Sequence, residues 1–290
     1  MADLSEFIIK NLISNPSIPR LKFKQLRGIT FELTGIWFED NPQVLVSIER
    51  NFNMFTGLEF TDHKEDIMAS ISDHYADKIA LVSYSQEDIK KLFKGVIYSE
   101  KKITEIKSLL RKGSNVLLAG SHFGGIEWSA AILTLIGLPC TIIANFKTEE
   151  VRKKAYLQAE KFNVDILDLR SVKNDYFKSL ILKPRCIITV VDAFDRWVRS
   201  NKRLKANILG EEVTLDRRID DFITKKLKSE VFWLNLKPTH ERNFEVILKK
   251  VKPCNNNYIE PLMKEWVAMV MENPGFLYIW DELSHLFNRN

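Results

Sequence analysis

Residues 116–128 read Val116-Leu-Leu-Ala-Gly-Ser-His-Phe-Gly-Gly-Ile-Glu-Trp128. The apolar run at 116–119, which ends in glycine and serine, is typical of a buried strand. The apolar stretch at 126–136 has the spacing of a helix. Strand, loop and helix in this order predict one unit of a parallel sheet, where functional side chains gather at the carboxyl ends of the strands.

Short apolar runs alternate with helix-like stretches along the rest of the chain. We expect strands at 141–144, 164–167, 186–191, 231–236 and 244–248, and helices at 148–162, 174–182, 214–228 and 258–272. This alternation predicts an α/β fold with a largely parallel central sheet flanked by helices.

Residues 1–111 have a different pattern and predict a mainly helical N-terminal part. Apolar residues recur there at three- and four-residue spacing near 4–14, 41–54, 63–79, 86–95 and 101–111. The turn at 112–114 is not a flexible linker. We therefore predict a single domain over 1–290, with 112–290 as its α/β catalytic part.

Composition sets broad limits on function. The chain has 290 residues, 45% hydrophobic and 28% charged, which allows a substantial core and argues against disorder. Its net charge of +5 fits either a mildly basic soluble protein or attraction to an acidic carrier or a phospholipid surface. The absence of an arginine-rich arm and of zinc-finger spacing argues against a nucleic-acid partner.

The cysteines and the apolar runs indicate a cytoplasmic protein. Cys140, Cys186 and Cys254 are far apart, and the first two lie in apolar runs, as expected for reduced core residues. The N-terminus lacks the pattern of a secretion signal. The longest apolar run, 130–144, is too short to span a bilayer.

His122 and Glu127 are the candidate catalytic residues. His122 is expected in the loop after the strand, and Glu127 in the first helical turn, where the helix dipole favours a carboxylate. Glu127 can then accept a hydrogen bond from one imidazole nitrogen and leave the other free as a base, like a triad without its nucleophile. The nucleophile would come from the substrate. Gly124 and Gly125 permit a tight turn, and backbone N–H groups there are candidates for stabilising an oxyanion.

The spacing alone is not specific. About 0.7 such pairs are expected by chance from five histidines and 38 acidic residues in 290, so a loop histidine beside a capping glutamate is the alternative interpretation. A second pair, His240 and Glu245, has no glycines and no following helix, and we interpret it as coincidental. The remaining histidines, interpreted as surface or packing residues, are His63, His74 and His285. The Gly-x-Ser-x-Gly elbow of serine hydrolases is absent around Ser121.

Around His122 and Glu127 the chain resembles the lysophospholipid acyltransferase superfamily, whose hallmark is a histidine and an acid separated by four residues. It most resembles the late lipid A acyltransferase branch, which has glutamate at the acid position. Four further segments resemble that branch: Ile48-Glu-Arg-Asn-Phe52, Val191-Asp-Ala-Phe-Asp195, Leu209-Gly210 with Thr214, and Asn273-Pro-Gly-Phe-Leu-Tyr-Ile-Trp280. The resemblance spans residues from about 45 to 283.

The resemblance implies transfer of a fatty acyl group from an acyl-carrier-protein or coenzyme A thioester to a hydroxyl or amine, with His122 as base and Glu127 orienting it. It implies neither a metal nor a covalent acyl-enzyme. We expect a lipid or small-molecule acceptor, with contact at the inner membrane surface as a peripheral protein where the acceptor is a lipid. Asp192 would support the site or contact the acceptor. The full set of expected substrate-binding residues is Ser121, Phe123, Gly124, Gly125, Lys147, Arg152 and Asp192.

Two other functions remain open on the same residues: a thioesterase that uses water as the acceptor, and a non-catalytic protein that binds acyl chains or lipids. Two groups of basic residues either form solvated helix faces or dock an acidic carrier or a phosphate-bearing donor. The basic cluster before the first strand comprises Lys101, Lys102, Lys107, Arg111 and Lys112, and the group after the second strand comprises Arg152, Lys153 and Lys154.

Overall fold

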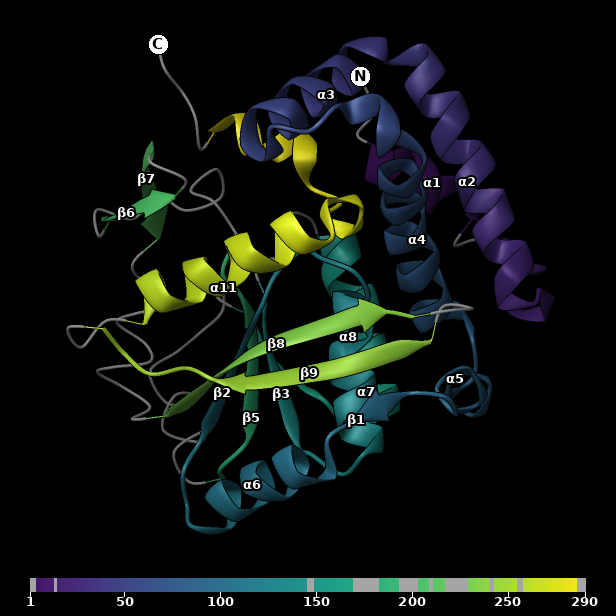
Figure 1. Ribbon diagram of the computed structural model, residues 1–290. Helices are drawn as coiled ribbons and strands as arrows, with labels where there is room; N and C mark the ends of the chain where they lie inside the picture. The colour runs from purple at the N-terminus through teal and green to yellow at the C-terminus, as the bar shows by residue number, and fades with distance from the viewer. Residues whose placement is uncertain are drawn as a thin grey trace.

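The computed structural model describes residues 4–12, 15–144, 149–168, 183–192, 203–208, 211–216, 229–239, 243–254 and 258–285. It shows a mixed sheet of mostly parallel strands flanked by helices, with a helical N-terminal region (Figure 1). This confirms the fold class predicted from the sequence. The single-domain organisation stays a prediction.

The N-terminal helices gather at one end of the sheet (Figure 1). They are α1 (Leu4–Leu12), α2 (Phe23–Asp40), α3 (Pro42–Thr56), α4 (Lys64–Ser83) and α5 (Gln86–Leu92). The apolar pattern did not single out α2, because two threonines occupy its buried face. The hydroxyl of Thr30 donates to the carbonyl oxygen of Leu26, and that of Thr34 to the carbonyl oxygen of Thr30, so the helix satisfies these buried groups internally.

The main sheet has the strand order β1-β9-β8-β2-β5-β3-β4. Its strands are β1 (Ile97–Tyr98), β2 (Val116–Gly120), β3 (Cys140–Ala144), β4 (Asp165–Asp168), β5 (Cys186–Val190), β8 (Glu230–Pro238) and β9 (Phe244–Lys250). The five strands from β8 to β4 run parallel, whereas β9 and β1 run in the opposite direction. The central strands β2 and β5 are apolar and almost wholly buried, as expected for strands covered on both faces.

A second, two-stranded antiparallel sheet pairs β6 (Arg203–Ile208) with β7 (Glu211–Asp216). The helix predicted to begin at 214 is therefore wrong at its start. Apolar and polar residues alternate through β7, which is the period of a strand. The rest of that helix, 217–228, and the helix predicted at 174–182 lie outside the described residues.

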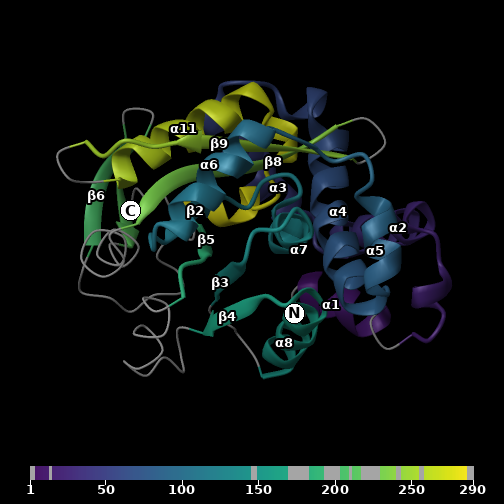
Figure 2. The ribbon, with the colours of Figure 1, turned by 90° about the horizontal axis from the view of Figure 1, so that it is seen from below.

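Helices cover the sheet on both sides. The helix α6 (Glu100–Arg111) packs on β2, α7 (Ser129–Leu135) on β3, and α8 (Glu149–Phe162) on both β4 and α4. Figure 2 shows α7 and α8 beside β3 and β4. In Figure 1, α11 (Ile259–Glu272) lies above β8, whereas α6 lies below β9, on the opposite side. The short helical turns η7 (Pro274–Phe276) and η8 (Trp280–His285) follow α11.

Hydrogen bonds from Lys161 and Asn51 to residues far away in the sequence position the helices that matter for the site. Lys161 on α8 donates through Nζ to carbonyl oxygens at the end of α4, at 3.2 Å from Leu81 and 3.0 Å from Tyr84. Asn51 on α3 is buried and donates through Nδ2 to the carbonyl oxygen of Trp280 at 2.7 Å. These bonds fix α4 against the sheet layer and fix η8 against α3.

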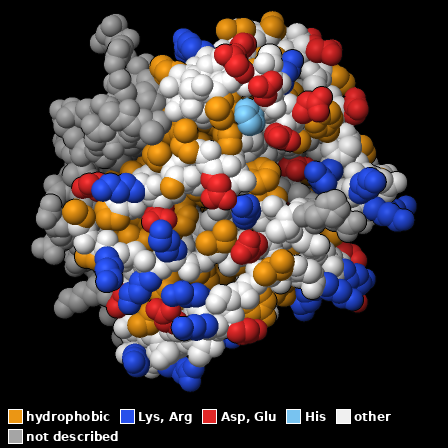
Figure 3. Space-filling view, in the orientation of Figure 1, with side chains coloured by type: hydrophobic (Ala, Val, Ile, Leu, Met, Phe, Trp, Pro, Cys, Tyr) orange, Lys and Arg blue, Asp and Glu red, His pale blue; other side chains and the backbone are white. Residues whose placement is uncertain are grey.

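The basic cluster of α6 lies away from the residues that follow β2. Lys and Arg side chains gather over the lower part of the molecule in Figure 3, around α6 and β9. Because α6 ends at Arg111 and β2 begins at Val116, the basic end of this helix adjoins the opposite end of β2 from His122. The cluster is therefore not placed beside His122.

Within the described residues, no helix is both long and apolar enough to cross a membrane.

Candidate active site

The loop after β2 is held between β8 and the C-terminal segment. Gly124 has φ of +59°, and a Cβ atom there would lie 2.5 Å from the carbonyl oxygen of Leu236. A Cβ atom at Gly125 would lie 2.1 Å from the ring of Phe244. Only glycine fits at either position, because the loop packs directly on neighbouring backbone and aromatic groups.

The N–H groups of these glycines have protein partners. Gly124 donates to the carbonyl oxygen of Phe276 at 3.0 Å, and Gly125 donates to that of Leu236 at 3.1 Å. The expectation that they stabilise an oxyanion is therefore corrected, since an oxyanion would have to displace these bonds. The two glycines position the loop that carries His122.

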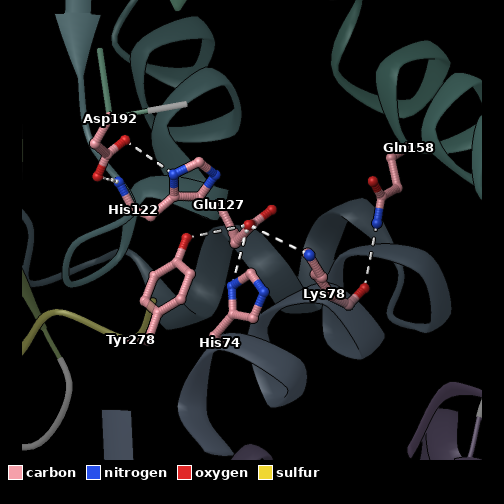
Figure 4. Close-up of polar contacts among 7 residues, drawn as sticks. All are labelled: His74, Lys78, His122, Glu127, Gln158, Asp192 and Tyr278. Atoms are coloured by element: carbon pink, nitrogen blue, oxygen red, sulfur yellow. Dashed lines mark hydrogen bonds and ion pairs between the residues drawn. The ribbon is translucent and has the colours of Figure 1, made fainter. Parts of the chain in front are cut away.

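His122 is paired with Asp192. Asp192 follows β5, which lies beside β2, so both residues lie at the carboxyl ends of neighbouring parallel strands. Oδ1 of Asp192 lies 2.9 Å from Nδ1 of His122, and its Oδ2 accepts the backbone N–H of His122 at 2.8 Å (Figure 4). The Asp192 side chain is fully buried, whereas that of His122 is 31% exposed. When Nδ1 donates to this carboxylate, the neutral imidazole keeps a lone pair on Nε2.

Glu127 is bound by other side chains. Its Oε1 lies 3.1 Å from Nδ1 of His74 and 3.7 Å from Nζ of Lys78, both on α4. The hydroxyl of Tyr278, between η7 and η8, donates to the same oxygen at 3.5 Å. The structure therefore corrects the expectation that Glu127 orients His122. Glu127 lies on the short helical turn η3 (Ile126–Trp128) that faces α4, whereas the end of β5 brings Asp192 to Nδ1.

Two aromatic contacts connect these groups. The rings of His74 and Tyr278 are stacked, with centroids 4.0 Å apart and an angle of 23° between planes. The rings of His122 and Tyr278 are roughly perpendicular, with centroids 5.8 Å apart and an angle of 86° between planes. Tyr278 thus lies between the two histidines, and its backbone N–H also reaches the carbonyl oxygen of His122 at 3.4 Å.

The pKa values of His74 and His122 are shifted in opposite directions. Burial lowers the pKa of His74, the charge of Lys78 lowers it further, and together they bring it to about 4, so His74 is neutral near pH 7. Burial also opposes protonation of His122, but Asp192, with smaller contributions from Glu127 and Glu282, outweighs burial and raises its pKa above the ordinary value.

Glu127 and Tyr278, which lie beside the histidines, do not change their protonation states near pH 7. Burial favours the neutral form of Glu127, but Lys78 and His74 outweigh it and hold the pKa of Glu127 well below its usual range. Burial and the nearby carboxylates, chiefly Glu127, raise the pKa of Tyr278 well above 10. Near pH 7, Glu127 is therefore an anion and Tyr278 keeps its proton.

Sequence reasoning missed His74, Lys78 and Tyr278. The sequence predicts a surface or packing residue at His74. It is buried and stacks on Tyr278, which confirms the packing alternative, and it also contacts Glu127, which the sequence did not indicate. The signal was that the apolar stripe formed by Ile67 and Ile71 continues along the same helix face with a histidine and then a lysine. Tyr278 lay within a segment that carried the family resemblance, but no role had been given to it.

The other predicted site residues have varied positions. Ser121 is buried beside His122, and Phe123 is buried with its ring edge against Phe276 at 5.7 Å. Arg152 pairs with Asp168, at the end of β4, at 2.9 Å, and no contact brings it to His122. Lys147 and the coincidental His240 lie outside the described residues. Within the described part of the chain, no group of histidine, cysteine and acidic side chains could hold a metal ion.

Comparisons with known proteins give no family for this chain. No protein-family model matches it, and no curated protein is significantly similar.

Proposed function

We propose that this protein is an acyltransferase that moves a fatty acyl group from an acyl-carrier-protein or coenzyme A thioester to a hydroxyl or amine acceptor. The supporting observation is the pair of His122 and Asp192 at the carboxyl ends of adjacent strands. The buried carboxylate fixes the imidazole through Nδ1 and leaves Nε2, on a partly exposed ring, as a base.

The chemistry follows from that geometry. Nε2 of His122 takes the proton from the acceptor O–H or N–H as the oxygen or nitrogen forms a bond to the thioester carbonyl carbon. The C–S bond then breaks, and the departing sulfur takes the proton from Nε2. The imidazolium formed in between is stabilised by Asp192, 2.9 Å away. Positioned base catalysis of this kind is typically worth about 10²–10⁴-fold.

The proposed acceptor is a lipid or a small molecule. With a lipid acceptor, the enzyme would act in the cytoplasm as a peripheral protein on the inner membrane surface. These assignments are supported by the resemblance around His122 and Glu127 and by the spread of cysteines typical of a reducing compartment.

The test is mass spectrometry of the products after incubation with acyl-coenzyme A and acyl-carrier donors and a panel of acceptors. We expect an acylated acceptor, and at least a hundredfold loss of transfer in the His122→Ala variant with the fold intact by circular dichroism. The matched control, His63→Ala, replaces a histidine that precedes α4 and packs against Phe52. It should keep the wild-type rate.

Three results would count against the proposal. Donor cleavage at a rate that no acceptor raises would instead identify a thioesterase. Acyl-chain binding without turnover would identify a binding protein. A folded His122→Ala variant with near-normal transfer would remove the base from the mechanism.

A further inference from the structure

The polar atoms of three side chains contact one oxygen of Glu127. Figure 4 shows the contacts from His74, Lys78 and Tyr278 meeting at Oε1. Two of these residues are one turn apart on α4, and the third comes from the C-terminal segment. The Glu127 side chain is 24% exposed, so burial alone does not immobilise it.

Without these contacts, the carboxylate of Glu127 would be free to bond the imidazole of His122. Tyr278 touches both groups, because its ring centroid lies 5.8 Å from that of His122 and its hydroxyl lies 3.5 Å from Oε1 of Glu127. In addition, the charge of Glu127 raises the pKa of His122. Since Asp192 occupies Nδ1, the nitrogen open to another acceptor is Nε2. A glutamate carboxylate that bonded Nε2 would stabilise the protonated imidazole and block the base.

We propose that His74, Lys78 and Tyr278 are positioning residues that pin the carboxylate of Glu127 beside His122 and prevent it from bonding Nε2. The importance of this arrangement for catalysis rests on the proposed function, although the pinning itself does not. The N-terminal helix α4 thereby forms part of the site, since two of the three positioning residues lie on it.

The titration midpoint of His122 depends on all the charged and titratable groups around it. Asp192, Glu127 and Glu282 favour its protonated form. His74 and Lys78 face Glu127 from α4, and Tyr278 faces Glu127, Asp192 and Asp77. His74 is neutral near pH 7 and Tyr278 keeps its proton, so replacing either of them removes a contact with Oε1 of Glu127 without changing the net charge.

Two substitutions of His74 separate its polar contact with Glu127 from its ring. The His74→Phe variant keeps a ring against Tyr278 but loses the Nδ1 contact with Oε1 of Glu127. The His74→Asn variant loses the ring but retains an N–H group near the position of Nδ1. The Tyr278→Phe variant removes one hydroxyl. Lys78 is a poor probe, because its removal changes the charge of the cluster.

The experiment is an NMR titration of the His122 imidazole in the full chain. In His74→Phe, the released Glu127 should reach Nε2 and raise the His122 midpoint by about 1 pH unit. Glu127→Gln should lower that midpoint, and the double variant should behave like Glu127→Gln alone. Tyr278→Phe should shift it upward by less, and His74→Asn should stay near wild type. The control His63→Phe should have no effect.

Activity gives a second measurement. The acid limb of the kcat/KM profile should move in the same direction as each midpoint, while KM on the alkaline plateau stays constant. An unchanged or lowered midpoint in folded His74→Phe would overturn the proposal. A His74→Asn variant shifted as far as His74→Phe would also overturn it, because the ring of His74 and not its polar contact with Glu127 would then matter. If His74→Phe does not fold, Tyr278→Phe decides, and an unchanged midpoint there overturns the proposal.

The outcomes separate this proposal from the proposed function. The titration needs no turnover, so a wild-type protein without transferase activity would defeat the function while the midpoints still report on the pinning. Conversely, the wild type could transfer the acyl group while the His122 midpoint stays unchanged in the His74 and Tyr278 variants. That result would refute the positioning role of these residues and would still agree with the proposed function.

Discussion

Replacing Asp192 by asparagine tests which acid orients His122. The buried carboxylate lies 2.9 Å from Nδ1, and a carboxylate this close to an imidazole shifts its pKa by about 1–3 units. Such a shift corresponds to about 1.4–4 kcal/mol. Because the carboxylate raises the pKa of His122, the Asp192→Asn variant should lower the midpoint by about that amount and cut kcat/KM by about 10²–10⁴-fold.

The assay is the NMR titration of His122, assigned by the resonance that His122→Gln removes, followed by transfer kinetics. Glu127→Gln should lower the midpoint less than Asp192→Asn does, because Asp192 makes the direct contact. Asp168→Asn is the matched control, since it changes another buried carboxylate that ends a strand and pairs with Arg152. It should leave the midpoint unchanged. A larger fall in Glu127→Gln than in Asp192→Asn would refute the pairing and restore Glu127 as the orienting acid.

Two further predictions concern stability. Gly125→Ala should destabilise the fold by about 1–3 kcal/mol or more in urea denaturation, because its Cβ would meet the ring of Phe244. The control Gly28→Ala, in a helix with open space around it, should stabilise by about 0.5–1 kcal/mol, and equal effects at the two positions would contradict the packing argument. For His74, folding lowers the pKa from 6.5 to about 4, so its contribution is present above pH 6.5 and is lost as the pH falls toward 4. Between pH 7 and 4 the wild type should lose about 3 kcal/mol more than His74→Phe, and parallel losses would show that His74 does not titrate as a buried neutral group.

The sequence predicted the fold where its periodicity was simple. Apolar runs such as 116–119 and 186–191 have no polar face, which is characteristic of strands covered on both sides, and both form central parallel strands. The helix α2 was not singled out, because a threonine can be buried in a helix when its hydroxyl bonds to the carbonyl oxygen four residues earlier. A search for hydrophobic residues at helical spacing does not detect a buried helix face that contains threonines.

The candidate site was predicted only in part, for a related reason. The spacing of His122 and Glu127 is local, and the loop that carries them follows β2 as expected. The contact between His122 and Asp192 spans 70 residues and depends on β5 lying next to β2 in the sheet. Strand order follows from packing of the whole chain, so the residue spacing does not contain it.

The motif glutamate has a different role from the one its spacing suggested. A residue in the first turn after the loop faces whatever packs on that turn, and here this is α4. His122 and Asp192, the acid that contacts its Nδ1, follow two neighbouring strands of the sheet. The N-terminal helices fix the second acid: α4 carries His74 and Lys78, and α3, through Asn51, holds Trp280 only two residues beyond Tyr278. The helical part and the sheet therefore meet at Glu127, which explains why a helix far from the motif in sequence can set the proton affinity of a residue in it.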